Sequence, residues 1–168
     1  METNIQSTHS EHPLKKVFKI CSVLLALLVA LSVFRGSSFA RSFRGRFMTS
    51  NTDFFLAYTY TSGLDTHYLL FSSDTNAVWL TSSRTGNACL ATYQGSSLAN
   101  GIDSVFYYSD GACHRNFKYR DPSDDSVLFV TETYGGSLPK VFPFEKADLE
   151  AAKTALDEMK TVYDVSKP

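Results

Sequence analysis

From Phe54 onward, apolar and polar residues alternate in short runs that predict β-strands. The run FFLAYTYT (54–61) places every second residue on one face, with Phe54, Leu56, Tyr58 and Tyr60 on one side of the strand. Turn residues such as Asp110-Gly111 separate one run from the next. The pattern predicts strands over residues 54–61, 67–73, 77–83, 88–94, 103–109, 113–120, 126–134 and 140–144.

The period changes near residue 145 and predicts a helix over about residues 145–163. Apolar residues then recur at spacings of three and four: Leu149, Ala152, Leu156, Met159 and Tyr163. Together these patterns predict a mainly β fold. We expect an antiparallel up-and-down meander of seven or eight strands, closed as a small barrel, with the C-terminal helix packed outside. A flat sheet with the helix across one face is the alternative.

The N-terminal part contains an uncharged apolar run from Ile20 to Phe34, which is 15 residues long. A membrane-spanning helix needs about 20 apolar residues, whereas the core of a signal peptide needs roughly 7 to 15. Lysines precede the run, and Ser38 and Ala40 are small residues at the −3 and −1 positions of a cleavage site after Ala40. We therefore expect residues 1–40 to be a signal peptide of a secreted protein; the alternative is a signal-anchor of a type II single-pass membrane protein.

Residues 41–52 follow as a basic linker, and residues 53–168 form a single domain in this interpretation. The stretch SSFARSFRGRF (37–47) is also typical of a bipartite plastid leader, which gives a plastid as a further alternative location.

Charge is divided unevenly along the chain. Residues 1–46 hold seven Lys or Arg and two Asp or Glu, whereas residues 47–168 hold nine and 15. The acidic domain argues against nucleic acid as a partner, because phosphate binding needs clustered cations. A membrane is expected as a partner only if the 20–34 segment is an uncleaved anchor, and the domain is expected to be a monomer.

Two cysteines remain beyond the leader, Cys89 and Cys113, and in an oxidising compartment they predict one disulfide. Cys113 and the adjacent His114 lack further ligands at a spacing suited to a metal, so no metal site is expected. The sequence also lacks the catalytic motifs G-x-S-x-G and H-E-x-x-H and a P-loop, so we expect neither a catalytic site nor a cofactor.

The segments HYLLFSS (67–73), ACLATY (88–93) and SVFYYSDGAC (104–113) resemble strands and a hairpin of lipocalins in the broad calycin sense, and faintly those of the salivary lipocalins of ticks. The resemblance implies a barrel that holds a small ligand. The sequence departs from that family in having no G-x-W before the first strand, since Trp79, its only tryptophan, lies in the third.

Aromatic residues carry the candidate binding site. Residues 47–168 contain nine Phe, nine Tyr and one Trp. Tyrosines that point into a barrel could wall a cavity while their hydroxyls orient a polar group of the ligand; covering the outer sheet surface is the alternative. The candidate ligand-binding residues are Tyr58, Tyr60, Trp79, Tyr93, Tyr107 and Phe129.

These observations favour a secreted or lumenal, non-enzymatic protein that binds a small, partly apolar molecule. One alternative is a disulfide-stapled β module that contacts a protein or glycan through its surface. A second is a chromophore-handling factor or an enzyme in a plastid, which requires the plastid leader.

Overall fold

The structure is a computed structural model that describes residues 13–74, 76–81 and 86–166. The chain divides into two compact units, with the boundary between Ser37 and Ser38. The first unit contains one helix, α1 (Pro13–Gly36). Within the residues described, no helix combines the length and the apolar character that crossing a bilayer requires.

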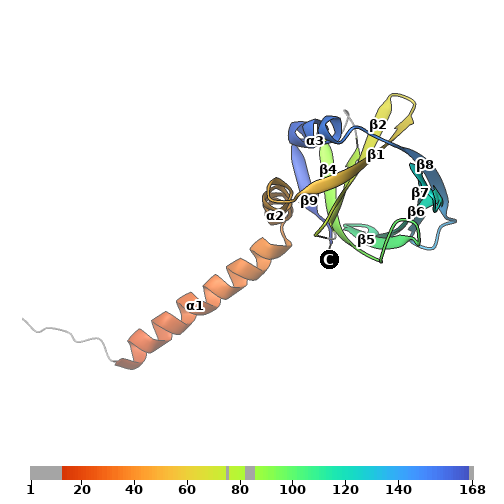
Figure 1. Cartoon of the computed structure of the whole chain (residues 1–168). Helices are drawn as coiled ribbons and strands as arrows, with labels where there is room; N and C mark the ends of the chain where they lie inside the picture. The colour runs from red at the N-terminus through yellow and green to blue at the C-terminus, as the bar shows by residue number, and fades with distance from the viewer. Residues whose placement is uncertain (1–12, 75, 82–85, 167–168) are drawn as a thin grey trace, which may run out of the picture. The chain divides into compact units, whose positions relative to one another are not determined.

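The second unit is built around one sheet that curls round an interior (Figure 1). Its order is β3-β2-β1-β8-β7-β6-β5-β4-β9, and β3 pairs in addition with β4. The strands are β1 (Phe54–Ser62), β2 (Asp65–Ser72), β3 (Asn76–Thr81), β4 (Asn87–Gln94), β5 (Ile102–Tyr108), β6 (Gly111–Asp121), β7 (Asp124–Tyr134), β8 (Lys140–Lys146) and β9 (Thr161–Asp164). The eight strands expected from the sequence correspond to β1–β8, and the mainly β fold with a C-terminal helix is confirmed.

The prediction of a closed antiparallel meander is wrong, because the sheet is mixed and is interrupted between β4 and β5. These two strands pair directly only through Tyr93↔Ser104 and Gln94↔Asp103. Along the first half of β4, β9 pairs with it in parallel, from Asn87↔Thr161 to Leu90↔Asp164. The final segment therefore occupies the seam that a simple meander would close.

The sheet has a core on each side. Inside the curl, aromatic and aliphatic side chains such as Tyr58, Phe106 and Phe117 have no solvent exposure. Outside, Ala57, Leu70 and other residues pack against the helices. Strands β1, β2 and β4 therefore bury both faces.

Helix α3 (Leu149–Glu158) covers the outer face of β1 and β2 (Figure 1). It begins at Asp148, whose side chain accepts a hydrogen bond from the Ala151 amide, and it buries Ala152 and Leu156. It is shorter than expected, because Met159 has extended backbone and the next residues form β9. Tyr163, expected on the helical stripe, instead packs inside the curl.

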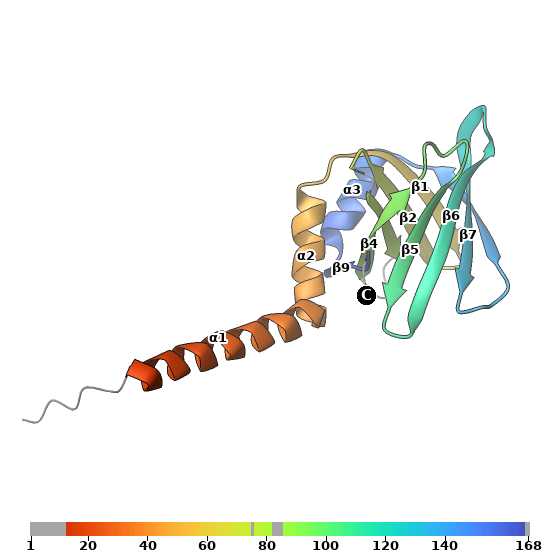
Figure 2. The same ribbon diagram turned by 90° about the horizontal axis from the view of Figure 1, so that it is seen from below.

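Helix α2 (Ser38–Ser50) lies beside β9 (Figure 2). Gly45 permits the close approach, because a Cβ there would lie 2.2 Å from the Val162 carbonyl oxygen. The Arg44 guanidinium pairs with the buried Asp164 carboxylate. Residues 41–50, expected as a linker, therefore belong to the folded unit.

Candidate functional site

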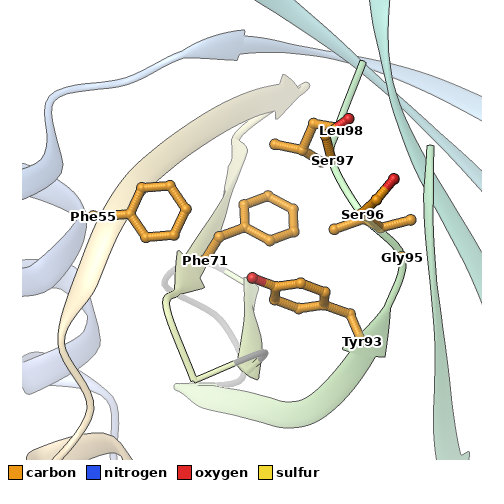
Figure 3. A pocket seen from close by; sticks show the side chains of 8 residues that line it. Phe55, Phe71, Tyr93, Gly95, Ser96, Ser97 and Leu98 are labelled. Carbon is orange, nitrogen blue, oxygen red and sulfur yellow. The ribbon is translucent and has the colours of Figure 1, made fainter. Parts of the chain in front are cut away.

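A cavity of about 240 Å³ opens near the start of β1 and the end of β4. Three aromatic side chains, Phe55, Phe71 and Tyr93, form one side of it, and the segment after β4 forms the other (Figure 3). Its complete lining is Phe55, Phe71, Tyr93, Gly95, Ser96, Ser97, Leu98 and Ile102.

A β-bulge accounts for the position of Phe55. The pairing of β1 with β2 shifts register between Phe54 and Leu56, so that Phe54↔Ser72 is followed by Leu56↔Phe71. Such a bulge redirects side chains relative to strict alternation. Phe54 is consequently buried in the outer core, whereas Phe55 lines the cavity and is 57% exposed.

The aromatic wall is held by edge contacts and one hydrogen bond. The Phe71 ring is buried and meets Tyr93 and Phe117 edge-on, with ring centroids 5.7 and 5.4 Å apart. The Tyr93 hydroxyl donates to the Ser72 carbonyl oxygen over 2.7 Å. Burial raises the pKa of Tyr93, so the hydroxyl keeps its proton at neutral pH. The Tyr93 oxygen can still accept a hydrogen bond from a ligand.

The segment after β4 is anchored at both ends. Gly95 has φ +140°, and a Cβ there would lie 2.4 Å from Ile102 Cγ2. The Leu98 carbonyl oxygen accepts a hydrogen bond from the Tyr119 amide over 3.0 Å. Because of these two constraints, the buried Leu98 side chain lies over the interior of the curl.

The serines of this segment bring hydroxyl groups to the cavity. Ser97 Oγ accepts from the Asn100 amide over 3.3 Å, and Ser96 Oγ accepts from Asn100 Nδ2 over 3.4 Å. Both hydroxyls act as acceptors in these bonds, so each has a proton to donate. The cavity thus combines an aromatic wall with a few polar groups at one side, which is the usual composition of a small-molecule site.

A second group of polar side chains, the arginine cluster, lies inside the curl around Arg115. Its Nε donates to Glu132 Oε1 over 2.5 Å, and its Nη1 donates to the Tyr108 hydroxyl over 3.2 Å. The guanidinium also lies 4.0 Å from the centre of the Phe106 ring. Burial acts to lower the pKa of Arg115, but Tyr108 and Glu132 raise it overall, so the side chain stays charged.

The arginine cluster affects the thiols near it. Burial raises the pKa of Cys89 and of Cys113, and the positive charge of Arg115 opposes this shift at both. His67, which stacks on Tyr60 with ring centroids 6.1 Å apart, has its pKa lowered by burial. The thiols are therefore protonated and the imidazole is neutral at pH 7.

In the structure both cysteines are free thiols, and the disulfide stays a prediction from the sequence. Their strands are not neighbours in the sheet. Cys89 on β4 pairs with Tyr163 of β9, and the Val165 carbonyl that follows β9 accepts from the Tyr107 amide of β5. Both β9 and β5 thus lie between β4 and β6, the two strands that contain the cysteines.

The structure brings three of the predicted ligand-binding residues into the interior core: Tyr58, Tyr60 and Tyr93. Only Tyr93 lines the cavity, because the Tyr58 hydroxyl donates to the Asp125 carbonyl and Tyr60 packs against Phe142 and Phe144.

The other predicted residues lie elsewhere. Tyr107 lines a second cavity of about 200 Å³ at the β4–β5 seam, with Gln94, Asp103 and Ser166. Phe129 is 36% exposed. The Trp79 backbone pairs with Leu69 and Cys89, and its side chain lies outside the described part of the structure.

Sequence reasoning missed Phe55, Leu98 and Arg115. Strict alternation along 54–61 assigned Phe55 no role in a site, since a bulge cannot be inferred from that pattern. The sequence does contain a signal for Leu98, because it is the single large apolar residue in the polar segment GSSLANG. Alternation along the strand could have indicated Arg115, because it shares the inward face of β6 with Cys113 and Phe117.

No protein-family model, curated protein or solved structure matches this chain. Among the described residues, no group of three or more His, Cys, Asp or Glu side chains could hold a metal ion.

Proposed function

We propose that this protein is a non-enzymatic, secreted or lumenal binding protein that holds one small, mainly apolar molecule beneath residues 95–98. The observation that carries the proposal is the cavity of about 240 Å³ between the Phe55, Phe71 and Tyr93 rings and that segment. Binding there requires only burial of apolar surface and a few placed hydrogen bonds.

The volume sets the size of the ligand. A protein cavity of about 150 Å³ lined by aliphatic and aromatic groups binds benzene, and this cavity is about 240 Å³. A fused bicyclic ring, or a short branched chain with about ten non-hydrogen atoms, is the class that fits. Larger molecules would have to displace Leu98 or Phe55.

The polar groups of the cavity determine where a ligand should carry its hydrogen-bonding groups. The hydroxyl protons of Ser96 and Ser97 favour a hydrogen-bond acceptor at one end of the ligand, and the Tyr93 oxygen favours a donor near the aromatic wall. The site therefore suits a neutral ring with one or two polar substituents.

Indole is a suitable first probe because it matches this size and has one N–H donor. In an amide NMR titration of the ¹⁵N-labelled protein, we expect saturable shifts at residues 93–98 and 102 and at Phe55 and Phe71. Phe55→Ser should weaken indole binding roughly 5- to 10-fold, since it removes about 50 Å² of apolar contact at ~25 cal/mol per Å².

Phe129→Ser is the matched control, because it also removes a solvent-exposed phenylalanine from a strand. It should leave indole binding unchanged. Shifts spread evenly over the domain, or an equal effect of the two variants, would refute the cavity as the binding site.

One observation favours a second function, an interaction surface on β7 and β8. Phe129 and Val141, which are 36% and 56% exposed, lie on neighbouring strands, and Phe129 pairs with the exposed Pro143. A compact apolar patch of this kind suits contact with another protein. Under this alternative, Phe129→Ser would abolish partner binding while indole binding stayed intact.

A further inference from the structure

Helix α2 presents a row of phenylalanines to solvent. Phe39, Phe43 and Phe47 follow at intervals of four residues, so they lie along one face of the helix. They are 69%, 66% and 64% exposed. The other side of α2 packs on the domain through Gly45 and the buried Thr49. The domain itself therefore does not cover this phenylalanine row.

The same helix is cationic. It contains Arg41, Arg44 and Arg46 and no acidic residue. At 100° per residue, Arg44 and Arg46 flank the phenylalanine row on opposite sides. The Arg44 side chain pairs with Asp164 yet stays 46% exposed, and Arg46 Nη1 donates to the Leu156 carbonyl oxygen over 3.3 Å. Aromatic side chains bordered by arginine are typical of helices that lie at the surface of a lipid bilayer.

The preceding segment of the chain supports the same environment. Helix α1 ends at Gly36 and α2 begins at Ser38. In α1, Val23, Leu24 and Val29 are between 55% and 59% exposed, and these three positions lie at least 100° apart around the helix. A helix that is apolar on every side is unfavourable in water. The segment immediately before α2 in the sequence therefore favours an apolar environment.

We propose that, in the full-length chain, α2 lies in the headgroup region of a phospholipid bilayer. Phe43 and Phe47 insert among the upper acyl chains, and the arginines lie at the level of the lipid phosphates. A second copy of the chain is the less suitable occupant. Asp164 neutralises Arg44, but pairing two such helices would still bring together two copies of Arg41 and Arg46, and α2 itself contains no acidic residue. This proposal is independent of the ligand cavity.

Tryptophan fluorescence in lipid vesicles tests the proposal directly. The full chain with Trp79→Phe and Phe43→Trp is mixed with vesicles of phosphatidylcholine and phosphatidylglycerol, in which the phosphatidylcholine is either normal or brominated. We expect the emission to shift to shorter wavelength and brominated lipid to reduce it roughly twofold. The control variant carries Trp79→Phe and Leu138→Trp, which places the indole at a site 87% exposed between β7 and β8.

The control should show neither change, even if α1 binds the chain to the vesicle. Equal quenching of the two variants, or no quenching of either, would overturn the proposal. An emission shift that occurs without lipid and grows with protein concentration would also overturn it, in favour of self-association. Circular dichroism of both variants verifies that the sheet is intact.

Discussion

Gly95 determines the path of the segment that covers the cavity. Its φ of +140° is one that residues with a side chain rarely adopt, and a Cβ would approach not only Ile102 Cγ2 but also its Cα, at 2.9 Å. The segment can leave β4 and pass over Ile102 only because no side chain is present at this position.

Gly95→Ala should therefore destabilise the domain by about 2–4 kcal/mol, through backbone strain and overpacking together. Gly63→Ala is the control, because Gly63 has φ +63° and no atom within 4 Å of the added Cβ. It should cost about 1 kcal/mol from the backbone alone. Urea unfolding measures both, and equal losses would show that the contact with Ile102 is not rigid.

The two interior thiols provide a test at the same scale. Burial raises the pKa of Cys89 and Cys113, so both remain protonated to higher pH than an ordinary thiol and become nucleophilic only as the pH rises further. At pH 8.5, iodoacetamide should label them about tenfold more slowly than the exposed Cys21 in the full chain.

Peptide mass spectrometry reads out this labelling site by site. After denaturation without a reductant, both interior cysteines should be labelled completely. A joined peptide that contains Cys89 and Cys113, resistant to labelling until reduced, would contradict the free thiols of the structure.

At the scale of elements, the contact between α2 and β9 joins the N-terminal and C-terminal ends of the domain. In an isolated helix, replacing glycine by alanine is stabilising by about 1 kcal/mol. Here the added methyl group of Gly45→Ala would meet backbone atoms of Val162 and Asp164, which cannot rotate away.

Gly45→Ala should therefore reverse that sign and destabilise the domain by about 1–3 kcal/mol. Ser50→Ala, at the exposed end of α2, is the control and should change stability little. Thermal unfolding distinguishes the two signs, and a more stable Gly45→Ala variant would mean that α2 does not pack closely on β9.

Elements that depend only on neighbouring residues were predicted well from the sequence. Strands β1–β8 followed from alternation and turn residues, and α3 followed from the spacing of Leu149, Ala152 and Leu156. The parallel strand β9 could not be predicted, because Thr161–Asp164 is too short for a clear period and its partner β4 is distant in sequence. That one strand also accounts for the interrupted pairing of β4 with β5.

The candidate site was predictable only in its chemistry. An excess of tyrosine and phenylalanine indicated an aromatic-lined interior, and Tyr93 does line the cavity. The bulge that places Phe55 and the turn that places Leu98 depend on contacts between segments, which strict alternation does not encode. Side chains such as Phe106 and Phe144 fill much of the interior of the curl. The space left for a ligand near Tyr93 is therefore small, about 240 Å³.

On the scale of the whole molecule, the two proposals concern different parts of the chain. The sheet buries an aromatic core and leaves a small cavity of about 240 Å³ near the start of β1. The N-terminal helices carry most of the exposed apolar residues that the structure describes. The two proposals thus place ligand binding in the sheet and membrane attachment in the N-terminal segment.

The most direct test of the central claim is native mass spectrometry of the protein purified from the cells that make it. The native mass minus the denatured mass gives the mass of any molecule held non-covalently. We expect an excess of about 100–200 Da, the mass of roughly ten non-hydrogen atoms. Leu98→Trp, which fills the cavity, should lack this excess, whereas Leu138→Trp should keep it. A wild-type protein with no excess mass, or an excess that Leu98→Trp retains, would contradict the proposed ligand site.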